Sequence, residues 1–117
     1  MPSQEAGSWP PPLKHVLLYE WEFRAAQSLV EVAERLREAR FYVVSPRDDV
    51  LVITSLARPG AVVIVMSQRT QRGGELLVIQ TPSGPYRFED LVRAVPVFAR
   101  LAGIRLTGFW HEAHQKP

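Results

Sequence analysis

The chain has 117 residues, with 14 Lys and Arg against 12 Asp and Glu, which leaves a net charge of only +2. This length predicts one domain, and 46% hydrophobic with 22% charged residues excludes wholesale disorder. The absence of cysteine excludes disulfides, a thiol nucleophile and a metal site built on thiolates.

The sequence predicts a cytoplasmic protein without a membrane partner. Its longest apolar run, residues 61–66, is too short to cross a bilayer, and its first residues lack the order of a signal peptide. The small positive charge permits nucleic-acid binding without requiring it. Ten prolines and no asparagine are typical of thermophilic proteins, and a GC-rich genome produces the same bias.

Three regions are predicted along the chain: an extended, proline-rich leader at residues 1–13, one domain at residues 14–110, and a polar tail at residues 111–117. The domain begins with a strand at residues 14–23, rich in β-branched and aromatic side chains. A helix with an apolar stripe follows. Its capping box is formed by Ser28 and Glu31, and a start at Ala25 is the alternative.

A meander of strands follows the first helix. Strands are predicted at residues 41–45, 50–57, 61–68 and 75–81, with a type I turn at residues 46–49 and a polar tip at residues 69–74. A second helix is predicted at residues 88–102, and Pro96 should kink or split it before Gly103 ends it. The last strand is predicted at residues 104–110.

This order, β-α-β-β-β-β-α-β, predicts an α+β fold with an antiparallel sheet of about five to six strands and two helices on one face. A ferredoxin-like sheet with an added hairpin is the first expectation for its topology. A twisted sheet that curls toward a half-barrel is the second.

The middle strands carry apolar side chains at both parities, although a sheet with one face in water should alternate apolar and polar residues. Two helices cover one face only. The other face therefore needs a second copy of the chain, another protein, or closure of the sheet upon itself. The expected partner interface comprises Val63, Val65, Leu77 and Ile79, or their opposite-parity neighbours, together with Trp9.

Polar and aromatic clusters suggest a second kind of partner. Arg69, Gln71 and Arg72 at the polar tip carry groups that contact phosphates, although a solvated hairpin tip has the same composition. Tyr19 and Trp21, with Phe23, lie on one side of the first strand. Such aromatic side chains either stack on nucleic-acid bases or fill a core, and core packing is the favoured interpretation.

No catalytic residue, metal ligand or cofactor is predicted. His111 and His114 are three residues apart, a spacing that chelates a metal on a helix, but they fall in the polar tail. No serine is paired with a base in a known motif. His15 is interpreted as a residue at the end of a strand.

These observations together predict a non-enzymatic protein-interaction module: an adaptor, an inhibitor or an accessory subunit. It would act through an apolar sheet face and its termini, with itself or another protein as partner. One alternative is a nucleic-acid-binding protein that uses the tip. The other is a small dimeric α+β-barrel enzyme that relies on aromatic residues and His15.

Overall fold

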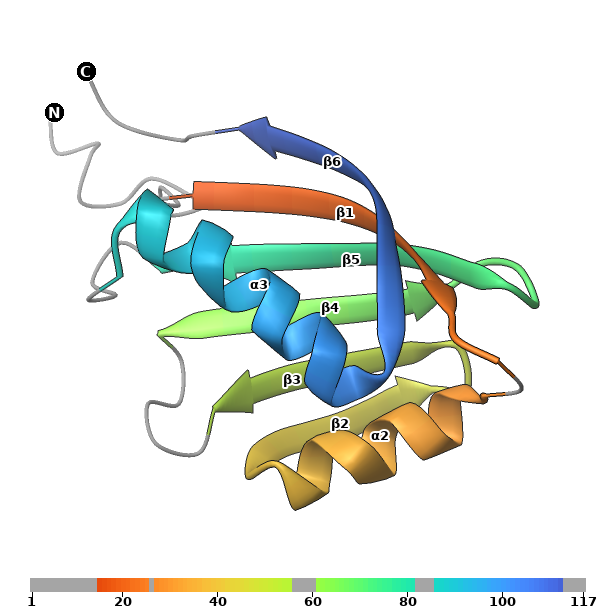
Figure 1. Cartoon of the computed structure of the whole chain (residues 1–117). Helices are drawn as coiled ribbons and strands as arrows, with labels where there is room; N and C mark the ends of the chain where they lie inside the picture. The colour runs from red at the N-terminus through yellow and green to blue at the C-terminus, as the bar shows by residue number, and fades with distance from the viewer. Residues whose placement is uncertain (1–14, 26, 56–60, 82–85, 113–117) are drawn as a thin grey trace, which may run out of the picture.

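The computed structural model describes residues 15–25, 27–55, 61–81 and 86–112 (Figure 1). Six strands and two helices follow one another in these ranges: β1 (His15–Phe23), α2 (Leu29–Glu38), β2 (Phe41–Arg47), β3 (Val50–Ser55), β4 (Val62–Gln68), β5 (Gly73–Gln80), α3 (Phe88–Ala102) and β6 (Ile104–Glu112). Trp9 and His114 lie outside the described residues.

The strands form one open sheet in the order β2-β3-β4-β5-β1-β6, with every neighbouring pair antiparallel. Removal of β3 and β4 would leave four strands in ferredoxin-like order, because β1 lies between the two strands that flank α3. The fold class predicted from the sequence is therefore confirmed, including the added hairpin. The two sheet edges, β2 and β6, do not meet.

The start of α2 and the end of α3 follow from signals in the sequence. The Ser28 hydroxyl accepts a hydrogen bond from the backbone N–H of Glu31 at 3.2 Å and caps α2. The alternative start is wrong, because Ala25 has a positive φ of 54° that a right-handed helix does not allow. Gly103, with a φ of 75°, ends α3 in the left-handed conformation.

Of the two outcomes expected at Pro96, a kink or a split, the split does not occur. α3 runs from residue 88 to residue 102 as one element, with Pro96 on its exposed side. A proline at this position leaves the Val92 carbonyl without its helical donor. Val92 is also exposed, so water can reach that carbonyl and limit the cost.

The hydrophobic core lies between the two helices and one face of the sheet, here called the inner face. Side chains from both helices and from all six strands join one buried cluster, so α2 and α3 cover the same face (Figure 1). Its largest fully buried members include Leu17, Leu36, Ile53, Met66, Leu76 and Ile104. Tyr19 and Trp21 belong to this cluster, which confirms core packing and leaves neither ring available for stacking on bases.

Three strands extend beyond their predicted bounds: β5 begins at Gly73 instead of residue 75, and β2 and β6 each end two residues later than predicted. β2 continues through Pro46 to Arg47, and the turn contains only Asp48 and Asp49. Proline is tolerated there because β2 is an edge strand, and the pairing with β3 is irregular between Val44 and Arg47. β6 extends to residue 112, so the backbone of residue 111 belongs to the sheet and not to a tail.

Candidate functional site

The face of the sheet opposite the helices, here called the outer face, is apolar at its centre. Cross-strand pairs place Val63 opposite Ile79 and Val65 opposite both Val52 and Leu77. All of these side chains point away from the helices and are partly exposed. Among the described residues, no helix or strand packs over them.

The outer face has a polar border at one end. Glu20 of β1 lies directly opposite Glu75 of β5 on this face, a like-charge pair that is unfavourable in isolation. Arg69 forms an ion pair with Glu75 at 3.1 Å and offsets that repulsion. At the opposite edge, Tyr42 and Val44 of β2 are 54% and 41% exposed and extend the apolar area.

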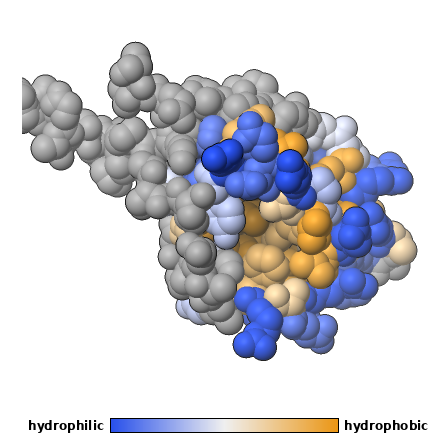
Figure 2. Space-filling model, turned by 60° about the vertical axis from the view of Figure 1, so that its left-hand side comes forward, coloured by the Kyte–Doolittle hydropathy of each residue, from blue (hydrophilic) through white to orange (hydrophobic). Residues whose placement is uncertain are grey.

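A second apolar feature lies on the helix side of the sheet, between α3 and the strands β2 to β5. It is a slot with a volume of about 390 Å³, here called the α3 slot. Figure 2 shows an apolar hollow bordered by hydrophilic side chains. Its floor includes Ile64 and Val78, and its upper wall consists of Ala94, Val97 and Leu101 of α3.

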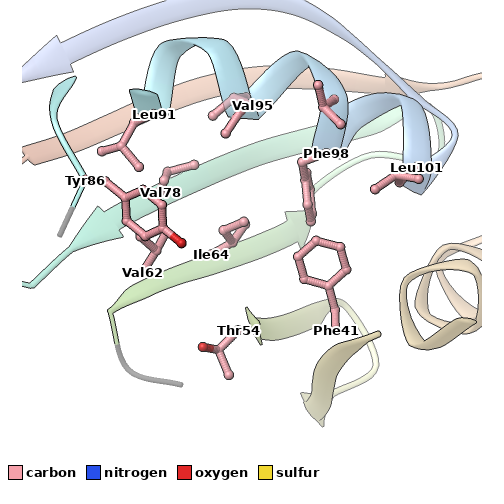
Figure 3. Close-up of a pocket in the computed structure, with 12 residues that line it drawn as sticks. Phe41, Thr54, Val62, Ile64, Val78, Tyr86, Leu91, Val95, Phe98 and Leu101 are labelled. Carbon is pink, nitrogen blue, oxygen red and sulfur yellow. The ribbon is translucent and has the colours of Figure 1, made fainter. Parts of the chain in front are cut away.

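Aromatic side chains define the two ends of the α3 slot (Figure 3). At one end Phe41 of β2 meets Phe98 of α3 edge to face, with ring centroids 5.6 Å apart. At the other end lies Tyr86, just before α3. The buried Gln80 side chain donates a hydrogen bond to the Tyr86 backbone carbonyl and so ties this residue to β5.

The slot follows from the width of the sheet. Six strands at about 4.8 Å spacing span about 29 Å, whereas two helices of about 10 Å each cover about 20 Å. The added hairpin widens the sheet without adding a helix, and about one helix width of the inner face is left open. Sequence reasoning missed this site, although the count of six strands against two helices was available to indicate it.

The tip between β4 and β5 is more ordered than its composition suggests. The Thr70 hydroxyl accepts hydrogen bonds from the backbone N–H groups of Arg72 and Gly73 at 3.2 and 3.1 Å. Gly73 is required there, because a Cβ would lie 1.9 Å from the Trp21 carbonyl oxygen. Arg69 is engaged with Glu75, whereas Gln71 and Arg72 are exposed.

Arginines gather beyond this tip, around two adjacent hollows that share Ala25 and Gln27. Arg72 and Arg105 line the first, with Glu22 and a volume of about 410 Å³. The second, of about 280 Å³, is lined by Arg24, Arg35, Arg100 and Glu31. Sequence reasoning found only Arg72 of this group, because the others come from three different elements. Arg105 pairs with Glu22, which lowers the excess of positive charge.

His15, on which the alternative enzyme hypothesis relies, does not contribute to the α3 slot. His15 is buried beside Phe88, with ring centroids 5.4 Å apart, and is not among the residues that line the α3 slot. Burial raises the pKa of the Tyr19 hydroxyl above its ordinary value, as expected for a phenol in the core.

Comparison with known proteins gave no match to a family model, a curated protein or a solved structure. Within the described ranges, no three side chains of His, Asp or Glu gather in a way that could hold a metal ion. Neither helix in the described part of the chain is long and apolar enough to span a membrane.

Proposed function

We propose that the protein is a non-enzymatic interaction module that works within an assembly. Its contact surface is the outer face of the sheet, and its partner is a second copy of the chain. What supports the proposal is the apolar centre of that face, which no described element covers. Apolar patches with a polar border are typical of protein interaction sites.

The size of the patch fits the centre of a dimer interface. Five strands at about 4.8 Å and two same-face positions per strand at about 6.8 Å give an area on the order of 350 Å². Two copies would bury about 700 Å², which contributes about 17 kcal/mol at about 25 cal/mol per Å². Association costs about 4–15 kcal/mol, and stable interfaces bury about 1,200–2,000 Å² in total, so the proposed dimer needs the polar border around this apolar centre as well.

A second copy is the occupant that fits this surface best. Two sheets pack face to face about 10 Å apart, so identical flat faces cover each other in one step. Pairing along the β2 edge is less favourable, because Pro46 offers no backbone N–H and the strand is irregular there. The contact is therefore assigned to the face and not to the β2 edge.

Replacement of Val65 by Lys tests the proposal. Val65 lies at the centre of the outer face, where an unpaired ammonium group in the interface would separate the copies. We expect the wild type to sediment as a dimer and the Val65→Lys variant as a monomer with unchanged circular dichroism.

The matched control is Val92→Lys. Val92 is an exposed valine of α3 that lies neither on the outer face nor among the residues lining the slot. This variant should remain dimeric. A wild type that sediments as a monomer over the whole dilution series would contradict the proposal.

A second candidate function, binding of a nucleic-acid backbone, is favoured by the arginines around the two hollows. Arg24, Arg35, Arg72 and Arg100 come from different elements and gather at one end of the molecule. Each contact to a duplex phosphate should contribute about 0.9 to the slope of log affinity against log salt.

Fluorescence anisotropy with duplex DNA and single-stranded RNA tests this candidate. Arg72→Ala should reduce the salt slope by about one unit if Arg72 contacts a phosphate. Arg47→Ala, which removes an arginine paired with Asp49 at the β2–β3 turn, serves as the control. Absence of binding by the wild type at low salt would eliminate this candidate.

A further inference from the structure

We infer that the α3 slot is a binding site for a small, elongated molecule with an aliphatic body and one polar end. The site lies on the inner side of the sheet, so it is separate from the outer face and does not depend on the proposed function. Its volume, its lining and the position of Tyr86 each contribute to the assignment.

The volume of the α3 slot fits a small molecule. The slot follows α3 from Leu91 to Leu101, eleven residues that span about 15 Å of helix. Its volume is about 390 Å³. Pockets for small ligands begin at about 300 Å³.

The apolar lining of the slot favours a ligand with an aliphatic chain. Ile64 and Val78 form a buried floor, while Val97 and Leu101 on the wall remain 48% and 41% exposed. A ligand in the slot would remove these wall side chains from water without displacing any buried polar group of the floor. The edge-to-face contact between Phe41 and Phe98 closes one end and limits the ligand's length.

Tyr86 selects the polar end. Its hydroxyl oxygen points into the slot in Figure 3, at the end opposite the Phe41–Phe98 contact. A tyrosine hydroxyl can donate to a carboxylate or accept from an alcohol. The hydrogen bond from Gln80 to the Tyr86 carbonyl holds the backbone of this residue in place.

Decanoic acid is the probe, titrated into the full-length chain below its micelle concentration by isothermal calorimetry. Ala94→Trp should fill the slot and weaken the binding of decanoic acid by at least about tenfold. Ala94 is exposed and lines the slot, so the slot is the apolar surface against which the indole ring can pack. Val92→Trp adds the same ring to α3 outside the slot and should leave the affinity unchanged.

Tyr86→Phe tests the polar end. Loss of one hydrogen bond should weaken the binding of decanoic acid by about two- to tenfold. The affinity for decane should be the same for the wild type and Tyr86→Phe, because decane has no polar end.

Amide chemical shifts recorded during the titration locate the probe. They should move at Ile64, Val78 and Val97 and stay constant at Val65 and Leu77 on the outer face. Shifts confined to the outer face would overturn the inference, as would equal affinities of the two tryptophan variants or no saturable binding by the wild type. The oligomeric state of Val65→Lys has no bearing on these results, so this inference and the proposed function fail independently.

Discussion

The inner and outer faces of the sheet are built from the same kinds of residue and differ in what lies over them. Leu76 is fully buried under the helices, whereas Leu77, the next residue, points to the outer face and is partly exposed. Met66 and Val65 form a similar pair in β4. Side-chain chemistry alone therefore does not decide which face becomes the core. The helices decide it, because their apolar stripes can cover only one face.

The adjacent leucines of β5 provide the strongest test of this comparison. Leu76→Ala should lower the free energy of unfolding by about 2–5 kcal/mol, because it leaves a cavity in a packed core. Leu77→Ala should cost far less at high dilution, where the outer face meets water. Urea unfolding of both variants measures the difference.

The same experiment can contradict the difference between the inner and outer faces. If Leu77→Ala costs as much as Leu76→Ala at every protein concentration, the outer face is packed within a single chain. If the cost of Leu77→Ala grows with protein concentration, the face is covered by association.

A smaller effect on stability is expected from a substitution that stabilises α3, the helix that packs on the inner face. Pro96→Ala restores a backbone donor inside α3 and should raise the free energy of unfolding by about 1–3 kcal/mol. The sedimentation of the protein should stay the same, since Pro96 lies far from the outer face. Arg93→Ala, an exposed change in the same helix, should stay within about 0.5 kcal/mol of the wild type. No gain from Pro96→Ala would mean that water fully replaces the missing bond.

The smallest effect separates an inner tyrosine from an outer one. Burial raises the pKa of Tyr19, so its neutral form is favoured in the folded state. The associated stability is present below pH about 10 and is lost as the pH rises above that value. Tyr19→Phe should therefore flatten the alkaline loss of stability, and Tyr42→Phe, on the exposed edge, is the comparison variant. The measurement is the urea midpoint of each variant below and above pH about 10. An equal pH dependence of the midpoint in the two variants would contradict the prediction.

The sequence predicted the elements well because each carries a local signal. Ser28 marks the start of α2, Gly103 marks the end of α3, and the β-branched runs mark the strands. The α+β class, with an antiparallel sheet and both helices on one face, was also predictable, since two helices and six strands in this order have few economical arrangements. The exact strand order was not.

The choice of face for each strand was not predictable. Strand parity is read from the contrast between apolar and polar residues, and β3, β4 and β5 lack that contrast. The α3 slot escaped prediction for a related reason. Leu101 fits the apolar stripe of the second helix, and only the packed structure shows that Leu101 and Val97 remain exposed beside the core.

The place of β1 in the sheet has a consequence for the order of folding. β1 is first in the chain, yet it pairs only with β5 and β6, so that His15 lies opposite Gln80 and Phe23 opposite Ile104. Strands β2 to β5 pair with their chain neighbours through hairpins and can form while the rest of the chain is still being made. Because distant pairings close slowly, we expect pulse-labelling hydrogen exchange to detect protection in β3 and β4 before β1. During synthesis β1 would then leave the ribosome first and find its second neighbour last.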